Sequence, residues 1–305
     1  MVVSGATGAI GLALINYVLS RQVRVLAICH KNSRRIGNLP KSDNLCILEL
    51  NVEEYSEFLN NKEEMALLGK YDCFFHLAWQ GTVGKARNDM NLQMSNIQYT
   101  LDGVELAAAL GCKCFIGAGS QAEYGRIEGK ISSRTPAFPE NGYGIAKLCA
   151  SQMTRELSHQ IGMEHNWVRI LSVYGPNDGA QSMIMSTINK LRKNEIPQFT
   201  KGEQMWDYLY SGDAGQAFKL VGEKGVDGKV YVLGSGKARP LVEYIEEIRN
   251  IVEPKGQIEL GVIPYSEKQV MHLQADVKEL MEDTGWSIST NFSKGIRNIL
   301  DWSTG

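Results

Sequence analysis

Tyr143 and Lys147 stand four residues apart in a stretch with helical length and apolar spacing, so their side chains are expected one turn apart on one face. An ammonium beside a phenol stabilises the phenolate and lowers the pKa of the phenol from about 10 toward working pH. Such a phenol can exchange a proton with an alcohol or a ketone. Because the chain has 12 tyrosines, this spacing also arises by chance. Other segments of the sequence are needed to tell a functional Tyr–Lys pair from a chance one.

The segment upstream of this pair is an apolar run that ends at Gly119 and Ser120. If the run is a strand of a parallel sheet, Ser120 lies at its carboxyl end, where such sheets bind ligands. The hydroxyl can then hydrogen-bond a substrate oxygen. Ser120, Tyr143 and Lys147 are therefore the predicted catalytic residues.

A glycine motif, Gly5-x-x-Gly8-x-x-Gly11, directly follows the first apolar run and opens a helical stretch. In that context glycines permit a tight turn, close backbone approach to a pyrophosphate and close packing of helix on strand. The helix N-terminus adds unpaired N–H groups and a partial positive charge. The residues expected to contact a dinucleotide are Gly5, Thr7, Gly8, Ala9, Ile10 and Gly11.

The end of the second strand predicts which dinucleotide is bound. An NAD site usually has an acidic residue about 20 positions after the glycines, for the ribose 2'-hydroxyl. Here residues 27–35 contain no acid, and we expect His30, Lys31, Ser33 and Arg34 to meet a 2'-phosphate. The sequence therefore predicts NADP(H) in preference to NAD(H), which stays possible; the alternative is a solvated basic turn.

The elements that must position these groups alternate between short β-rich runs and longer helical stretches. The predicted strands are 1–4, 23–28, 45–50, 73–77, 112–118, 166–171 and 229–233, and the predicted helices are 10–19, 88–110, 143–160, 241–252, 276–284 and 292–302. Continuously apolar strands are typical of a sheet covered on both faces. We predict an α/β fold with a doubly wound parallel (Rossmann) sheet. Its dinucleotide-binding domain covers 1–172, with a returning segment near 206–234, and a smaller substrate-binding lobe covers 173–305.

Composition narrows the partners and the setting. The 32 basic and 34 acidic side chains nearly cancel, so we expect no nucleic-acid partner. No apolar run approaches the roughly 18–20 residues that span a bilayer, and the first residues do not resemble a signal peptide. We therefore expect a cytoplasmic protein without membrane contact. The six cysteines lack metal-ligand spacing and are expected to be buried thiols, with Cys112 and Cys114 on one strand face, so no metal site is predicted.

These motifs together resemble the extended short-chain dehydrogenase/reductase family. The resemblance covers nearly the whole chain and is carried by the glycine motif, His76-Leu77-Ala78, Asn96, Ser120 five residues before Gly125, Tyr143-x-x-x-Lys147, Arg169 ahead of Tyr174-Gly175-Pro176, Gly285-Trp286 and residues 299–302. It implies that Tyr143 exchanges the proton, Ser120 orients the oxygen and Lys147 holds the nicotinamide ribose. It also implies cofactor contacts at Leu77, Ala78 and Asn96, a nucleotide-sugar substrate and a possible homodimer.

Departures from the family pattern narrow the activity. Family 4,6-dehydratases follow the catalytic hydroxyl with Asp-Glu, whereas Gln121-Ala122 stand here and cannot transfer that proton. Relatives often have Arg-Asp-Phe where this chain has Trp206-Asp207-Tyr208, so Arg192 or Arg239 is expected to contact the substrate instead.

Further substrate contacts are expected near the strand ends. Trp79 and Arg87 follow one strand end, where the alternatives are core packing for Trp79 and a surface ion pair for Arg87. Gln121 and Glu123 follow another, and for Glu123 a helix-start or solvated carboxylate is the alternative. His76 is expected to be a hydrogen-bonded core histidine, and the segment 183–185 is expected to fill core.

The leading hypothesis is an NADPH-dependent reductase of a nucleotide-linked 4-keto-6-deoxy sugar, because the segments 117–125 and 79–82 look similar to such reductases. The first alternative is an NAD-dependent nucleotide-sugar 4-epimerase. The second is a noncatalytic dinucleotide-sensing protein on the same fold.

Overall fold

The structure, a computed structural model, describes residues 1–303. Its main sheet has seven strands in the order β10-β6-β5-β4-β1-β2-β3, and every neighbouring pair is parallel. These strands are β1 (Val2–Ser4), β2 (Val25–Cys29), β3 (Leu45–Glu49), β4 (Cys73–His76), β5 (Cys114–Ser120), β6 (Glu164–Ile170) and β10 (Val230–Leu233). The chain leaves β3 at one edge and returns to β4 on the other side of β1, so a switch point lies between β1 and β4. The predicted fold class is confirmed.

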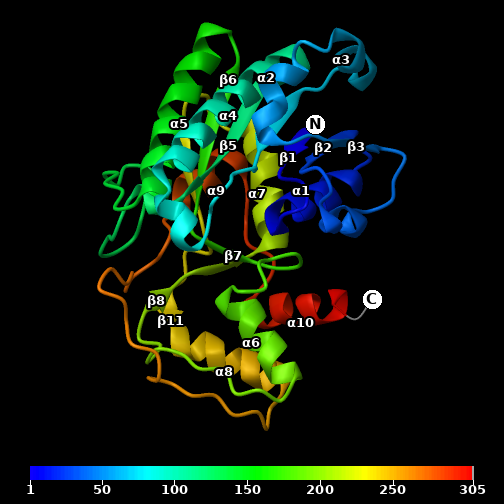
Figure 1. Ribbon diagram of the computed structural model, residues 1–305. Coiled ribbons are helices and arrows are strands. Elements are labelled where there is room, and N and C mark those ends of the chain that lie inside the picture. The colour runs from blue at the N-terminus through cyan, green and yellow to red at the C-terminus, as the bar shows by residue number, and fades with distance from the viewer. Residues whose placement is uncertain (304–305) are drawn as a thin grey trace.

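Helices cover both faces of this sheet (Figure 1). One layer contains α1 (Ala9–Leu19), α7 (Ser211–Lys224) and α9 (Lys278–Thr284); the other contains α2 (Tyr55–Phe58), α4 (Met90–Ala109) and α5 (Gly142–Gln160), and α3 (Lys62–Leu68) follows α2. Alternate strand residues feed two cores: Val3 and Phe75 pack with the first layer, Val2 and Phe74 with the second. Burial on both faces explains why the central strands lack a polar alternation.

The smaller lobe is built from short elements around a separate core (Figure 1). Its strands are β7 (Ser172–Tyr174) parallel to β9 (Tyr208–Tyr210), and β8 (Met205–Trp206) antiparallel to β11 (Arg239–Pro240). Its helices are α6 (Met183–Arg192), α8 (Leu241–Val252) and α10 (Phe292–Trp302). Ile184 is buried in this core with Met183 and Met185 packed against it, as predicted for core filler. No helix within residues 1–303 is long and apolar enough to cross a membrane.

Two predictions about the sheet need correction. β3 lies at the edge and is largely exposed, including Cys46 and Ile47, because no strand or helix layer covers it fully. Cys112 lies before β5 and packs in a different core from Cys114, so the two thiols do not share a strand face.

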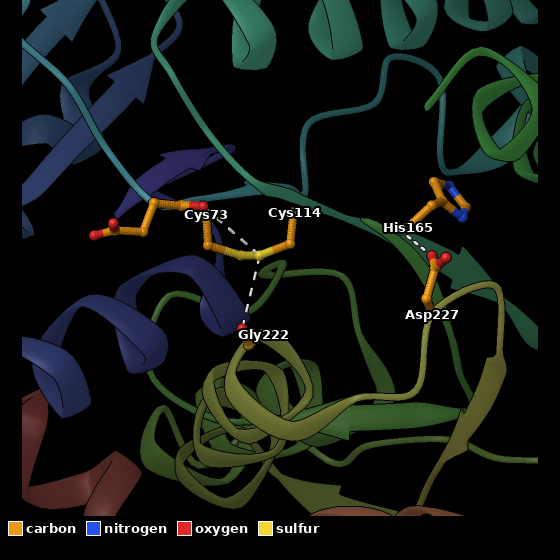
Figure 2. Close-up of a disulfide and its surroundings, with 6 residues drawn as sticks. Cys73, Cys114, His165, Gly222 and Asp227 are labelled. Atoms are coloured by element: carbon orange, nitrogen blue, oxygen red, sulfur yellow. Dashed lines mark hydrogen bonds between the residues drawn. A yellow bond between two sulfur atoms is a disulfide. The ribbon is translucent and has the colours of Figure 1, made fainter. Parts of the chain in front are cut away.

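The prediction that all six cysteines are thiols is wrong for Cys73 and Cys114, which form a disulfide between β4 and β5 (Figure 2). These residues stand opposite each other in the register of the two strands, with their Cα atoms 4.8 Å apart. Cys114 Sγ lies 3.7 Å from the carbonyl oxygen of Gly222 in α7. Strand adjacency brings the two together, and a linear pattern of residues does not reveal which strands are neighbours.

Candidate active site

The turn between β1 and α1 has the shape that a pyrophosphate requires. Gly5 has φ +67°, and a Cβ there would lie 2.8 Å from the backbone of Leu77 and Ala78. A Cβ on Gly11 would lie 2.4 Å from Gly5 O, whereas one on Gly8 would meet only that oxygen, at 3.4 Å. Gly8 is the N-cap of α1 without a side-chain cap, so the first N–H groups of the helix remain free for an anion. The residues present therefore fit a dinucleotide phosphate.

The predicted basic turn after β2 is exposed, but its cations are not equivalent. Lys31 forms an ion pair with Glu54 at 2.5 Å, and the His30 imidazole lies 2.7 Å from Lys31 O. Ser33 caps the following 3-10 helix by accepting from Arg35 N. The Arg34 side chain is exposed and makes no hydrogen bond or ion pair with any residue of the described chain. Of the predicted set, Arg34 is thus the cation that a ligand can engage at no cost to another contact.

Asn177, which the sequence reasoning missed, ties the lobe to this part of the molecule. It is 6% exposed and has φ +63°, a conformation that Asn adopts more readily than most residues. Its Nδ2 donates to Thr7 O in the glycine turn at 3.2 Å. Arg35 Nη1 donates to Asn177 O at 3.0 Å, and Asn38 Nδ2 donates to Asn177 Oδ1 at 2.7 Å. The glycine turn, the basic turn and the lobe therefore meet at one residue.

Ser120, Tyr143 and Lys147 come together at the carboxyl end of β5. Ser120 ends β5, while Tyr143 and Lys147 lie in the first two turns of α5, whose N-cap Asn141 accepts from Gly144 N. Lys147 is 3% exposed, and its Nζ donates to Ala118 O at 2.6 Å. The Ser120 hydroxyl lies close enough to the Tyr143 phenol to lower the pKa of that phenol. A serine hydroxyl, a phenol and an ammonium are thus assembled as a proton-exchanging group requires.

The electrostatics of the pair differ from the expectation. Burial raises the pKa of Tyr143 above its usual 10, opposed by the hydrogen bond from Ser120 and by the charge of Arg87. The predicted lowering of this pKa by Lys147 is not seen; the nearby cation that lowers it is Arg87. Burial lowers the pKa of Lys147 to about 7, opposed by the charge of Glu123.

Trp79 and Arg87 face the catalytic pair. Lys147 Nζ lies 3.8 Å from the centroid of the Trp79 ring, which meets the Tyr143 ring edge-on at 6.1 Å. The Arg87 guanidinium stacks over the Tyr143 ring at 4.4 Å and donates to Thr82 O at 3.0 Å. Trp79 thus packs against Lys147 and Tyr143. Arg87 makes a cation–π contact with Tyr143 rather than a surface ion pair.

Asn96, predicted to contact the cofactor, is 2% exposed and bonded at both ends of its amide. Its Oδ1 accepts from Gln80 N at 2.9 Å, and its Nδ2 donates to Gln80 O and Leu92 O, both at 3.0 Å. Its amide is fully used in holding the loop after β4. Leu77 and Ala78, at the start of that loop, lie against Gly5.

The prediction that Glu123 contacts substrate is wrong, because its side chain is fully buried and both oxygens are engaged. Oε1 accepts from Ser120 N at 2.7 Å and Trp167 Nε1 at 3.0 Å. Oε2 pairs with Arg169 at 2.6 Å. Glu123 therefore completes the capping box of the short helix Gln121–Glu123 and holds the backbone of its N-cap, Ser120, which agrees with the helix-start alternative. Gln121, by contrast, stays partly exposed beside Ser120.

The two arginines expected to contact the substrate are also committed elsewhere. Arg192, at the end of α6, donates to Ser303 Oγ at 2.6 Å and lies against α10. Arg239 forms an ion pair with Glu247 and stacks over the Tyr244 ring at 3.9 Å. Each guanidinium keeps further N–H donors beside these contacts, and Arg239 also lines a cavity of about 540 Å³, so both substrate contacts stay predictions.

The fold and this cluster define an enzyme of the short-chain dehydrogenase/reductase type. A sequence model of the NAD dependent epimerase/dehydratase family matches residues 1–234, and the chain belongs to this family.

Three relatives illustrate the range. CDP-abequose synthase of Salmonella muenchen is 24% identical over 98% of this chain and 96% of its own length. The dTDP-glucose 4,6-dehydratase of Xanthomonas campestris pv. campestris is 25% identical over 62% of this chain; the match spans 57% of that enzyme's length. The UDP-glucose 4-epimerase of Thermotoga maritima, solved with UDP-glucose, superimposes with a TM-score of 0.86 at 22% identity, covering 99% of this chain and 98% of that one.

Proposed function

We propose that this protein is an NADPH-dependent reductase of a nucleotide-linked 4-keto-6-deoxy sugar. The observation that carries the proposal is the surroundings of Ser120. Gln121 and Ala122 follow it, and the carboxylate of Glu123 is bound by Arg169. Neither an amide nor a methyl group can move the proton of a dehydration, whereas Tyr143 can protonate a ketone oxygen.

The residues divide the work as follows. Ser120 hydrogen-bonds the ketone oxygen and holds it beside the Tyr143 phenol. Tyr143 gives its proton to that oxygen as the carbonyl becomes an alcohol, and Arg87 stabilises the phenolate left behind. A reduced nicotinamide, when bound, supplies the hydride to C4. The balance is one ketone, one NADPH and one proton for one alcohol and one NADP⁺.

A further observation supports the cofactor in this proposal. Arg34, in the turn after β2, is an exposed cation whose side chain has no partner in the described chain, which suits a 2'-phosphate. NADPH also suits a reductase, because a reductase consumes its reduced cofactor.

We propose that the smaller lobe, formed by β7, β8, β9, β11, α6, α8 and α10, holds the nucleotide part of the substrate. A cavity of about 250 Å³ opens between α6 and the segment 197–204. It is lined by Met183, Thr187, Lys190, Phe199, Gln204 and Leu241 among others. Gln204 is 3% exposed and its Oε1 has no hydrogen-bond partner, so a donor on a bound base would satisfy it. This cavity has no local sequence signal.

We also propose a homodimer through the paired helices α4 and α5. Their outer face exposes Met94 (66%), Ile145 (52%) and Met153 (45%). Such a grouping of large apolar side chains on neighbouring helices favours a protein partner. Light scattering should give twice the chain mass, and Ile145→Glu should give the monomer; a monomeric wild type would reject the dimer.

The activity is tested by supplying dTDP-, CDP- and UDP-4-keto-6-deoxyglucose with NADPH or NADH and following absorbance at 340 nm. We expect NADPH oxidation that matches the alcohol formed, and a loss of about 10²–10⁴-fold in Tyr143→Phe. No oxidation with any of these ketones would reject the reductase.

The same protein should be incubated with UDP-glucose and no added cofactor. Epimer formation without net NADPH loss would establish the 4-epimerase instead, since the Ser120–Tyr143 pair suits both reactions. Binding of dinucleotide without either reaction would favour a sensing role.

A further inference from the structure

Gln93 in α4 is a buried amide that connects the two side chains facing the catalytic pair. It is 1% exposed. Its Oε1 accepts from Trp79 Nε1 at 2.9 Å. Its Nε2 donates to Gly81 O at 3.0 Å and to Ala86 O at 2.9 Å. Both N–H donors and the oxygen of this amide are thus used to fix the loop after β4.

The first set of contacts runs from Gln93 through Trp79 to Lys147. The Trp79 indole, held by Gln93, presents its face to Lys147 Nζ at 3.8 Å and its edge to Tyr143 at 6.1 Å. The other groups facing Lys147 are Glu123 after β5, His76 in β4 and Tyr143 on its own helix. The indole therefore both attracts the ammonium and keeps water away from it.

The second set of contacts runs from Gln93 through Ala86 and its neighbour Arg87 to Tyr143. Ala86 belongs to a short 3-10 helix, η3 (Gly84–Asn88), which also carries Arg87. The bond from Gln93 Nε2 to Ala86 O fixes η3 on α4, and Arg87 then stacks over Tyr143 at 4.4 Å. The groups that influence the phenol are Ser120, Arg87 and Glu123. The bond to Ala86 is thus a side-chain contact by which α4 sets the height of Arg87 above the ring.

We propose that Gln93 is a positioning residue that sets Trp79 against Lys147 and Arg87 against Tyr143, and so controls proton transfer without touching the substrate. The claim about catalysis rests on the proposed function, while the claim about geometry does not. Replacing the amide by an apolar side chain of similar size leaves the Trp79 indole N–H and the Gly81 carbonyl without this partner, and leaves Ala86 O with Asp89 N alone.

The test compares Gln93→Leu with Gln98→Leu, a matched control on the exposed side of the same helix, where Gln98 bonds Asp102. We expect kcat with NADPH and the 4-keto sugar to fall about tenfold to a hundredfold, since loss of orientation costs that much. The KM for NADPH should change less than kcat, because Gln93 makes no hydrogen bond to the glycine turn. The kcat pH profile should shift upward, because a displaced Arg87 no longer lowers the pKa of Tyr143.

A second measurement does not depend on activity. Lysines labelled with ¹³C at Cε are titrated by NMR, with Lys147 assigned by its absence in Lys147→Met. In the wild type its pKa should be about 7. Burial is the main cause of this low value, so an indole released in Gln93→Leu admits water and moves the pKa toward 10.5. Trp79→Leu should reproduce the shift, and Gln98→Leu should not.

The outcomes separate the two proposals. An inactive wild type rejects the reductase, and the lysine titration then decides on Gln93 alone. Unchanged kcat, pH profile and Lys147 titration in a folded Gln93→Leu protein would reject the positioning role. A fall in kcat equal to that of Gln98→Leu would reject it as well.

Discussion

Two cations in the turn after β2 look interchangeable in the sequence and are not interchangeable in the structure. Lys31 is held by Glu54, whereas Arg34 is without a partner among residues 1–303. To bind Lys31, a 2'-phosphate would have to break the Lys31–Glu54 ion pair. To bind Arg34, it would have to break no contact. Arginine also offers a fork of donors that matches a phosphate.

We therefore expect Arg34→Gln to weaken NADPH binding about tenfold or more, as loss of a charged hydrogen bond does, while NADH binding stays the same. Fluorescence titration of both cofactors measures this. Lys41→Gln, which removes an exposed cation elsewhere, is the control. Equal losses for NADPH and NADH would mean that Arg34 does not read the 2'-phosphate.

Local sequence patterns were enough to single out Ser120, Tyr143 and Lys147. Ser120 ends a strand, and Tyr143 and Lys147 lie one turn apart in a helix. The residues that the sequence misassigned or missed depend on distant partners. Glu123 meets Arg169, 46 positions away, and Asn177 meets Thr7, 170 positions away. Such pairings follow from the packing of the sheet, so no local pattern predicts them.

Among the secondary-structure elements, α7 is a helix whose glycines kept the sequence analysis from predicting it. The predicted strands and helices lie within a few residues of those observed, but the sequence did not predict the helices α2, α3, α6 and α7 or the lobe strands β7, β8, β9 and β11. Glycines disfavour helices, and α7 contains several. The structure supplies their reason: a Cβ on Gly215 would lie 2.6 Å from Leu14 N in α1, and one on Gly222 would lie 2.7 Å from Phe75 Cζ. Close packing here outweighs helix propensity.

Gly215→Ala should therefore destabilise the protein by about 1–3 kcal/mol, the usual cost of overpacking, although alanine is the better helix former. Urea denaturation measures the free energy of unfolding. Gly179→Ala is the matched control, because a Cβ there meets nothing within 4 Å. A stabilised Gly215→Ala would show that α7 can move away from α1 at no cost.

Across the whole molecule, an aromatic row crosses the sheet beneath α4 and α5. It runs from Phe74 through Phe115 to His165 and Trp167, with successive ring centroids 5.7 Å, 6.0 Å and 6.2 Å apart. His76 stacks on Phe115 at 5.8 Å and bonds Ser4 Oγ at 3.1 Å, as a core histidine was predicted to do. Burial lowers the pKa of His76 to about 3 and that of His165 to about 4.

These two histidines should make the fold sensitive to acid. The unfolded chain binds a proton at each below pH 6.5, the folded one only near pH 3–4. The folded state therefore loses stability as pH falls from 6.5, by about 1.4 kcal/mol per pH unit for each histidine.

Urea titrations between pH 7.5 and 4.5 measure this slope. His165→Gln should reduce it by about one proton, and His30→Gln, which alters an exposed imidazole, serves as the control. An unchanged slope in His165→Gln would contradict the assignment.

The open flank of the sheet has a practical consequence. β3 carries a row of unpaired backbone groups, an exposed Ile47 and the accessible sulfur of Cys46. A strand of this kind is a template for another chain, and in air-equilibrated buffer dissolved O₂ can oxidise the Cys46 thiols of two such chains to a disulfide. Stored preparations should accumulate cross-linked oligomers that a reductant reverses and that Cys46→Ser prevents, and concentrated samples are best handled as that variant.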